Sequence, residues 1–366
     1  MILRISLRLV VMISFFSLWI ALFNKKAVHL PRALVGRTAL FVSLNSIPKS
    51  ASGSSSRVQL INDQLQSVLD QGATLLIVLG NNQNQSVHNF ASELNSLADS
   101  CHRQSVDIAA EEPKQDESKS KIEFYKMAGL DAQFVSSNLP KSCPRLYWLG
   151  TPKKTQIIPV NDHWLSTCIQ DFQNWHSAMN KIPKLFQEAK QGELITSSPF
   201  KGSSYFKECH SSELVAELGL VSLFFQQGMP ALFYGDEFGL VTQARVEKLN
   251  AFPPDPSQYD QKLQTLATNL IHLRQNRPSL ARGDFSILFE DAERGIIVAV
   301  RKYRFEYSLL FLNLSHRQHE VRINFPSLSA NSIQDLLGGA VFNSTALGID
   351  IDLPAQGYAL LGTTGL

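Results

Sequence analysis

Residues 212–235 read SELVAELGLVSLFFQQGMPALFYG, and this stretch decides the fold class. Apolar residues recur at helical spacing through its first part, which predicts a helix over residues 212–227. Gly228 and Pro230 are typical of a helix end, and the apolar run over 231–235 is typical of a buried strand. A helix that leads directly into a buried strand is the repeating unit of an α/β fold.

The same alternation extends over residues 37–280. The expected strands cover residues 39–44, 75–80, 106–109, 133–136, 145–149, 156–160, 193–196 and 231–235, with helical patterns between most of them. This order favours a (β/α)8 barrel of the TIM type. Only eight residues separate the strand ending at 136 from the one starting at 145, too few for a helical crossover. The barrel is therefore predicted to be degenerate, with a helix missing at this joint.

From residue 281 the pattern changes to short strands separated by polar turns. They are expected at 285–289, 296–300, 309–312, 320–325 and 358–361, with no helical stretch between them. This pattern predicts a C-terminal antiparallel β-sandwich over residues 281–366.

The N-terminus predicts a single membrane helix. A mostly apolar run without charges follows Arg8 and ends before Lys25, although a cleaved signal peptide is an open alternative. Ser14, Ser17 and Ala21 would share one face that lets a partner helix approach closely, or they align by accident. The expected order is a cytoplasmic tail (1–8), a transmembrane helix (9–24) and a neck (25–36).

Other sequence features point outside the cytosol or exclude functions. Three N-x-[ST] acceptors favour an extracellular, glycosylated body: Asn84, Asn313 and Asn343. Together with the apolar N-terminus they favour a lumenal or extracellular body. The formal net charge of +2 argues against a nucleic-acid partner. Neither a metal-ligand cluster nor a phosphate loop occurs in the sequence, so no metal or cofactor is expected.

The four cysteines form no CxxC motif. Two disulfides and buried free thiols are equally compatible with their spacing. They are Cys101, Cys143, Cys168 and Cys209.

Three stretches, at 228–239, 270–285 and 129–136, resemble the amylase-like glycoside hydrolases. They correspond to the last barrel strand, to the closing helix with the entry to the sandwich, and to the fourth-strand motif. Within this superfamily the chain most resembles the heavy chain of heteromeric amino-acid transporters, of the cell-surface antigen type. This resemblance implies a single-pass type II protein of the plasma membrane with most of the chain outside the cell. The short loop at 111–121 implies a barrel that lacks the amylase insert domain.

The resemblance allows the catalytic positions to be checked one by one. Retaining glycosidases need two carboxyl groups about 5–5.5 Å apart. The nucleophile position corresponds to Ser136, the expected arginine before it to Phe134, and the general acid after Gly150 to Thr151. A hydroxyl supplies no formal negative charge, so no catalytic residue is expected. The neighbouring carboxylates Asp236 and Glu237 are interpreted as structural, on the assumption that they lie on an extended strand.

These observations predict a non-catalytic heavy subunit that escorts a multi-spanning amino-acid transporter light chain. The family's neck cysteine is replaced by Ala27, so the association is expected to be non-covalent. One alternative is an anchored or secreted α-glucosidase or amylase-like hydrolase. Another is a secreted carbohydrate-binding or adhesion protein.

Overall fold

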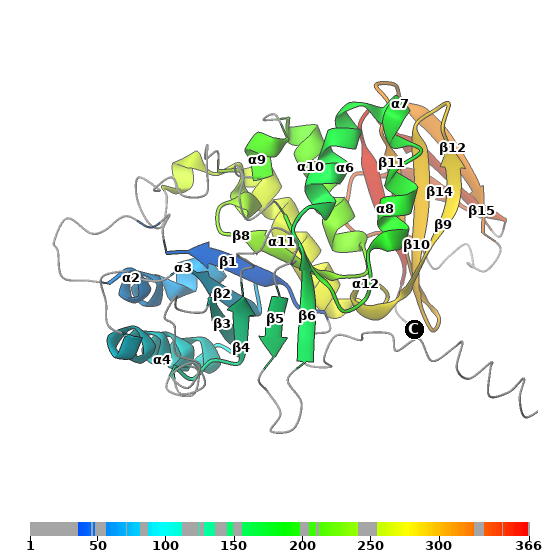
Figure 1. The fold of residues 1–366 in the computed structure, drawn as a ribbon. Helices are drawn as coiled ribbons and strands as arrows, with labels where there is room; N and C mark the ends of the chain where they lie inside the picture. Colours follow the sequence, from blue (N-terminus) through cyan, green and yellow to red (C-terminus); the bar gives the residue numbers. More distant parts are fainter. Residues whose placement is uncertain are drawn as a thin grey trace, which may run out of the picture.

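The protein consists of a closed barrel followed by two antiparallel sheets (Figure 1). The computed structural model describes residues 36–44, 47, 56–70, 72–80, 87–111, 124, 128–135, 145–148, 156–197, 205–209, 212–240, 255–325, 333–345 and 347–364. The barrel strands are β1 (Ala39–Ser43), β2 (Leu75–Leu79), β3 (Asp107–Glu111), β4 (Ala132–Val135), β5 (Arg145–Trp148), β6 (Gln156–Asn161), β7 (Leu194–Thr196) and β8 (Met229–Phe233). The eight predicted strands and their order around a TIM-type barrel are confirmed.

One strand of the barrel runs against the others. β5 pairs antiparallel with both β4 and β6, whereas the other neighbouring pairs, including β8 with β1, are parallel. A parallel neighbour requires a crossover of a dozen or more residues, while a short connection returns the chain antiparallel. The short joint before residue 145 therefore reverses the strand. Among the described residues no helix lies between β4 and β5, as predicted, and the reversal of β5 is a feature that the sequence did not indicate.

Helices cover the outside of the barrel. They are α2 (Arg57–Asp63), α3 (Leu65–Leu69), α4 (Val87–Arg103), α6 (Trp164–Gln173), α7 (Trp175–Ala178), α8 (Ile182–Glu188), α9 (Tyr205–Glu208), α10 (Glu213–Phe225), α11 (Gln261–Asn276) and α12 (Pro278–Arg282). The side chain of Ser212 caps α10, and Asp260 caps α11 by accepting hydrogen bonds from two backbone N–H groups of its first turn. α10 is buried around nearly its whole circumference, because it packs between the barrel, α6 and α11.

Aromatic side chains fill the barrel interior. The ring of Phe41 stacks on Phe233 at 4.8 Å and meets the edge of Phe134 at 5.5 Å. All three lie in one buried apolar cluster with small and aliphatic residues from every strand of the barrel. The interior is thus a packed core, as in other β/α barrels, and any site must lie at one of its two edges.

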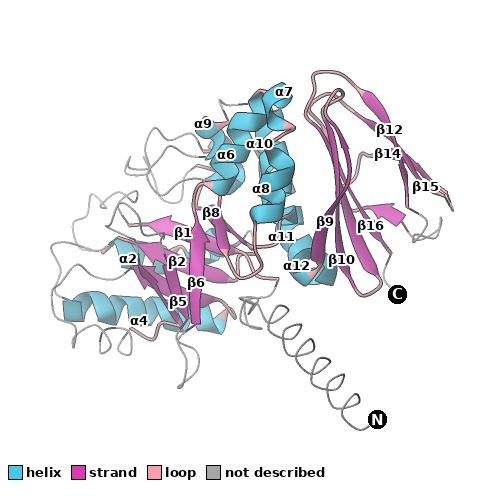
Figure 2. Ribbon diagram, turned by 45° about the vertical axis from the view of Figure 1, so that its right-hand side comes forward, coloured by secondary structure: helices cyan, strands magenta, loops and turns pink. Residues whose placement is uncertain are grey.

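The C-terminal part is a two-sheet sandwich (Figure 2). One sheet has the order β13-β16-β11-β10-β9 and the other β12-β15-β14. Their bounds are β9 (Asp284–Asp291), β10 (Ile296–Tyr303), β11 (Glu306–Asn313), β12 (His319–Asn324), β13 (Ile333–Asp335), β14 (Val341–Ser344), β15 (Gly348–Leu353) and β16 (Tyr358–Thr363). The predicted sandwich is confirmed, although β13, β14 and β15 were not anticipated.

Two buried arginines bind the end of α10, and one of them, Arg301, joins the sandwich to the barrel. Arg274 of α11 donates to the carbonyls of Phe224 and Gln226, at 2.5 and 2.8 Å. Arg301 of β10 donates to the carbonyls of Phe225 and Gln226, at 2.8 and 2.6 Å. Both guanidinium groups therefore bind carbonyls that the end of α10 leaves without helical partners.

The N-terminal prediction concerns residues outside the described part. In the portion of the chain that the structure describes, none of the helices has the length and apolar character needed to cross a membrane. Residues 9–24, with Ser14, Ser17 and Ala21, lie outside it, so the membrane helix stays a prediction.

Candidate active site at the carboxyl edge of the barrel

Glu111 is a carboxylate that faces the barrel axis at the edge where β/α barrels carry their chemistry. On β3, the side chain of Ala109 belongs to the apolar cluster inside the barrel, and that of Ala110 belongs to the cluster between the barrel and its helices. Side chains alternate along a strand, so the side chain of Glu111 points into the barrel like that of Ala109. Its side chain is half-buried, and its Oε2 accepts a hydrogen bond from the N–H of Gly80 at 2.6 Å. This bond fixes the carboxylate between the ends of β2 and β3.

Polar groups lie at the same edge on the far side of the mouth. Thr196, the last residue of β7, is buried and faces inward by the same alternation, since Leu194 is in the interior cluster. Asp162 directly follows β6, is half-buried, and lies 3.4 Å from Nε2 of the exposed His163. The edge thus carries two carboxylates and a hydroxyl next to the aromatic rings that fill the barrel interior (Phe41, Phe134 and Phe233), which we call the aromatic floor. This apolar layer lowers the local dielectric constant and strengthens the electrostatic interactions of the polar groups.

Asp236 ties the loops after β7 and β8 together. The carboxylate is buried, and it accepts hydrogen bonds from Ser197 Oγ at 2.6 Å and from the N–H of Tyr205 at 2.9 Å. Both of its oxygens are therefore used inside the protein, which makes it a structural group.

Glu237 is a second buried carboxyl group beside it. Its Oε2 accepts from the N–H of Gly235 at 2.8 Å, and its Oε1 has no hydrogen-bond partner among the described residues. Burial, with a further contribution from Asp236, raises the pKa of Glu237 to about 8. The two carboxyl groups lie in a 3-10 helix (η2, Asp236–Phe238), so the assumption that they occupy an extended strand was wrong.

The reversal of β5 changes the interpretation of the family's general-acid position. Because β5 runs antiparallel, its carboxyl end at Trp148 leads to the edge opposite Glu111. The segment that was aligned with the acid, Gly150 and Thr151, follows this strand end and lies outside the described residues. The end of β5 therefore does not lead to the edge that carries Glu111, where the family has its general acid.

The structure also bears on Ser136 and Phe134, the two other family positions that were compared. Ser136 lies outside the described residues. Phe134 is buried in the barrel interior at the register of Glu111, where it forms part of the aromatic floor. Sequence reasoning assigned Glu111 to a solvated loop and missed it, although continuing the strand alternation from residue 109 would have turned it inward.

The predicted glycosylation acceptors differ in exposure. Asn313 is fully buried, and its Nδ2 donates to the carbonyls of Arg317 and Pro354, both at 2.7 Å. A glycan therefore cannot be attached to it in the folded chain, which corrects that prediction. Asn343 is exposed on β14, and Asn84 lies outside the described residues.

Three of the four cysteines are buried free thiols, so the disulfide alternative does not hold for them. Burial, reinforced by Asp131, raises the pKa of Cys101 to about 12, which keeps it protonated and unreactive. The other two are Cys168 and Cys209, whereas Cys143 lies outside the described residues.

Solved structures share this arrangement of barrel and sandwich. The α-amylase of Geobacillus thermoleovorans, solved with acarbose, aligns with a TM-score of 0.66 and 12% identity over 92% of this chain and 100% of that chain. The debranching enzyme of Nostoc punctiforme aligns with a TM-score of 0.68 and 12% identity over the same shares. The chain has the fold of the amylase-like glycoside hydrolases.

Sequence similarity to curated proteins is confined to part of the chain. A cyclomaltodextrinase of Geobacillus thermopakistaniensis is 27% identical over 133 residues, which are 36% of this chain and 22% of that relative. This chain thus matches only about a fifth of the length of that relative. No protein-family model matches the chain.

These relatives contradict the function expected from the sequence. A non-catalytic heavy subunit of an amino-acid transporter was predicted, whereas the proteins matched by fold and by sequence are hydrolases. The expectation that the chain is not an enzyme is contradicted by the same findings. The amylase-like part of the resemblance is supported, while the association with a light chain and the plasma-membrane location stay untested.

Proposed function

We propose that this chain is a glycoside hydrolase that acts on α-linked glucans, and that Glu111 is one of its reacting carboxyl groups. The main support for this proposal is the position of Glu111, which faces the barrel axis at the carboxyl edge. The backbone N–H of Gly80 holds its carboxylate there by a hydrogen bond. The substrate class is supported by the names of the relatives, a cyclomaltodextrinase and an α-amylase solved with acarbose.

Glycoside hydrolysis needs a second carboxyl group on the other side of the scissile bond. Asp162 supplies one after β6, and β4 and β5 separate it from Glu111 along the barrel wall. A sugar bound across the mouth would then lie between the two groups. Asp236 and Glu237 are less suited to this role, because both are buried and neither faces solvent.

Hydrolysis of defined substrates tests the proposal. The purified full chain is incubated with maltoheptaose and with β-cyclodextrin, and the released reducing ends are measured. Glu111→Gln and Asp162→Asn keep the size of each side chain and remove its charge. Each should lower turnover by about 10²-fold or more, the usual contribution of a positioned acid or base.

Glu290→Gln is the matched control, since Glu290 is exposed on β9 in the sandwich and should leave turnover unchanged. Circular dichroism would show that all variants are folded. A folded wild-type chain that cleaves neither substrate contradicts the proposal, and so does a Glu111→Gln variant with full activity.

A further inference from the structure

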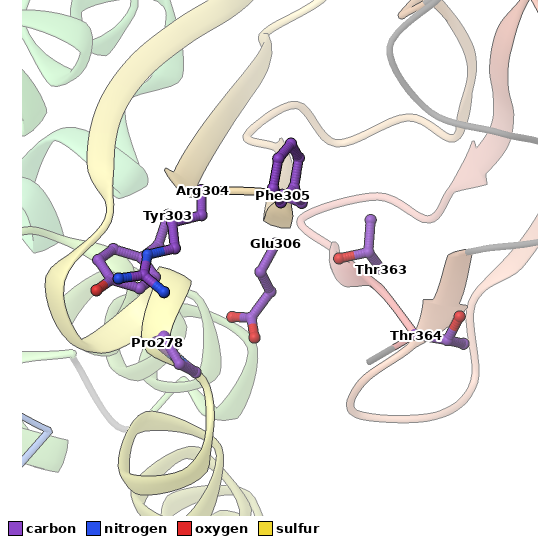
Figure 3. A pocket seen from close by; sticks show the side chains of 7 residues that line it. All are labelled: Pro278, Tyr303, Arg304, Phe305, Glu306, Thr363 and Thr364. Atoms are coloured by element: carbon purple, nitrogen blue, oxygen red, sulfur yellow. The ribbon is translucent and has the colours of Figure 1, made fainter. Parts of the chain in front are cut away.

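The sandwich carries a pocket of about 240 Å³ (Figure 3). None of the residues that line it belongs to the carboxyl edge of the barrel. It is formed by the turn between β10 and β11, the start of α12 and the end of β16. The residues used below are Pro278, Tyr303, Phe305, Glu306, Thr363 and Thr364. Ligand sites for drug-sized molecules measure about 300–1,000 Å³, so this pocket has room for a smaller group.

Phe305 presents an aromatic ring at the rim of this pocket. The ring is 76% exposed, and Figure 3 shows it beside the opening between Glu306 and Thr363. A tight turn places it there, because Tyr303 pairs with Glu306 and the residue before Phe305, Arg304, has a φ of +55°. The guanidinium of Arg304 lies 5.4 Å from the ring centre of Tyr303, so it leaves the face of Phe305 open.

Glu306 supplies a fixed acceptor in the same pocket. Its Oε1 accepts hydrogen bonds from the N–H and the hydroxyl of Ser279, at 2.7 and 2.5 Å. Within the described residues, no hydrogen bond occupies its Oε2. The carboxylate is thus held in one orientation with an oxygen available to a ligand, and charged acceptors form the stronger hydrogen bonds.

The opposite wall carries two hydroxyl groups. The hydroxyl of Thr363 is engaged by Tyr307, since it accepts from that residue's N–H at 3.1 Å and donates to its carbonyl at 3.5 Å. Thr364 is exposed at the mouth. A hydroxyl can both donate and accept, so this wall suits a ligand that is itself rich in hydroxyl groups.

We infer that this pocket binds one sugar ring of a glucan chain, as a second binding site separate from the barrel mouth. The apolar C–H face of the ring would cover Phe305, while its hydroxyl groups donate to Glu306 and exchange hydrogen bonds with Thr364. The choice of an α-linked glucan rests on the proposed function, whereas the choice of a sugar rests on the pocket. Such a site would hold a long substrate near the enzyme while another part of it enters the barrel mouth.

Titration calorimetry of the full chain with a sulfur-linked maltotriose analogue, which glycosidases do not cleave, tests the assignment. Phe305→Ala should weaken binding to the pocket about tenfold, equivalent to about 1.4 kcal/mol. Phe305→Trp should keep or improve it, and the emission of the new tryptophan should change on binding, which reports on this pocket alone. Val341→Ala, which changes an apolar residue that is 70% exposed on β14, is the matched control and should bind as the wild type does.

Equal affinities of the wild type and Phe305→Ala, or no emission change in Phe305→Trp, overturn the pocket assignment. Equal binding of a sulfur-linked cellotriose analogue overturns the preference for α-linkages. Failure of the two proposals can be told apart. Hydrolysis with binding that is insensitive to Phe305 contradicts only the pocket, whereas binding that depends on Phe305 without any hydrolysis contradicts only the proposed function.

Discussion

Replacing Arg301 by Met should destabilise the whole molecule, because this side chain links the sandwich to the barrel. Arg301 is fully buried on β10 and donates to carbonyls of Gly283, Phe225 and Gln226. Burial lowers the pKa of Arg301 to about 9, which still leaves the guanidinium charged at pH 7. Met has a similar length and fills the space, but it offers no donor.

The size of the effect follows from the carbonyls that lose a donor. Gln226 O keeps its hydrogen bond from Arg274, so Phe225 O and Gly283 O are the groups that lose theirs. A buried polar group left unsatisfied costs about 1–3 kcal/mol, which gives about 2–6 kcal/mol for two. Removing a desolvated charge beside the buried Arg274 offsets part of this cost. We therefore expect the free energy of unfolding to fall by about 2–4 kcal/mol.

Urea unfolding, followed by circular dichroism and tryptophan fluorescence, measures the change. Arg301→Met should lower the midpoint of the transition. Transitions that differ between the two probes would show that barrel and sandwich unfold separately. Arg322→Met is the control, since Arg322 is an exposed residue of β12 whose only described partner is Asp350, at 2.5 Å. It should leave the midpoint nearly unchanged. An Arg301→Met midpoint equal to that of the wild type would refute the reasoning.

Three further predictions concern other buried groups. The pKa of Glu237 is raised from 4.5 to about 8 in the folded chain, so the folded state binds more protons than the unfolded state between these values. The wild type should lose stability as the pH rises from about 5 to 8, and Glu237→Gln should remove this loss; parallel stability curves of the two proteins would contradict it. Gly219→Ala should lower the free energy of unfolding by about 1–3 kcal/mol, because the added Cβ would clash with the hydroxyl of the buried Tyr205. Thermal unfolding measures this loss, and an unchanged melting temperature would contradict it. A thiol reagent should label Cys101, Cys168 and Cys209 only after denaturant is added, because all three are buried. Rapid labelling of these residues in the native chain would contradict the prediction.

The sequence was informative where local pattern and burial agree. The apolar run at 231–235 predicted a strand because β8 is buried on both faces. Because α10 is buried on nearly all sides, it has no polar face, and its end was predicted from Gly228 and Pro230. Strand order followed from chain order, because neighbouring strands in such barrels are usually consecutive.

What could not be read from the sequence depends on direction and distance. The direction of β5 cannot be read from its own residues, so only the short joint before it indicated an irregular connection. β14 has alternating exposed and half-buried residues, including the exposed Val341, and lacks the apolar run that marks a central strand. Asn313 carries a glycosylation motif, yet its side chain is needed to bind the carbonyls of a neighbouring loop.

The candidate site shows the same limits. Glu111 was assigned to a polar loop because the residues after it are polar, whereas its place at the end of β3 depends on pairing with β2 and β4. The comparison with the family's general acid at Thr151 depends on the direction of the fifth strand, and β5 runs opposite to the other strands.

The kcat/KM for maltoheptaose, measured for the wild type and for Glu111→Gln, tests the central claim most directly. We predict measurable cleavage by the wild type and a decrease of about 10²-fold or more in the variant, with both proteins folded. Equal kcat/KM values for the two proteins, or no cleavage by a folded wild-type chain, would contradict the account.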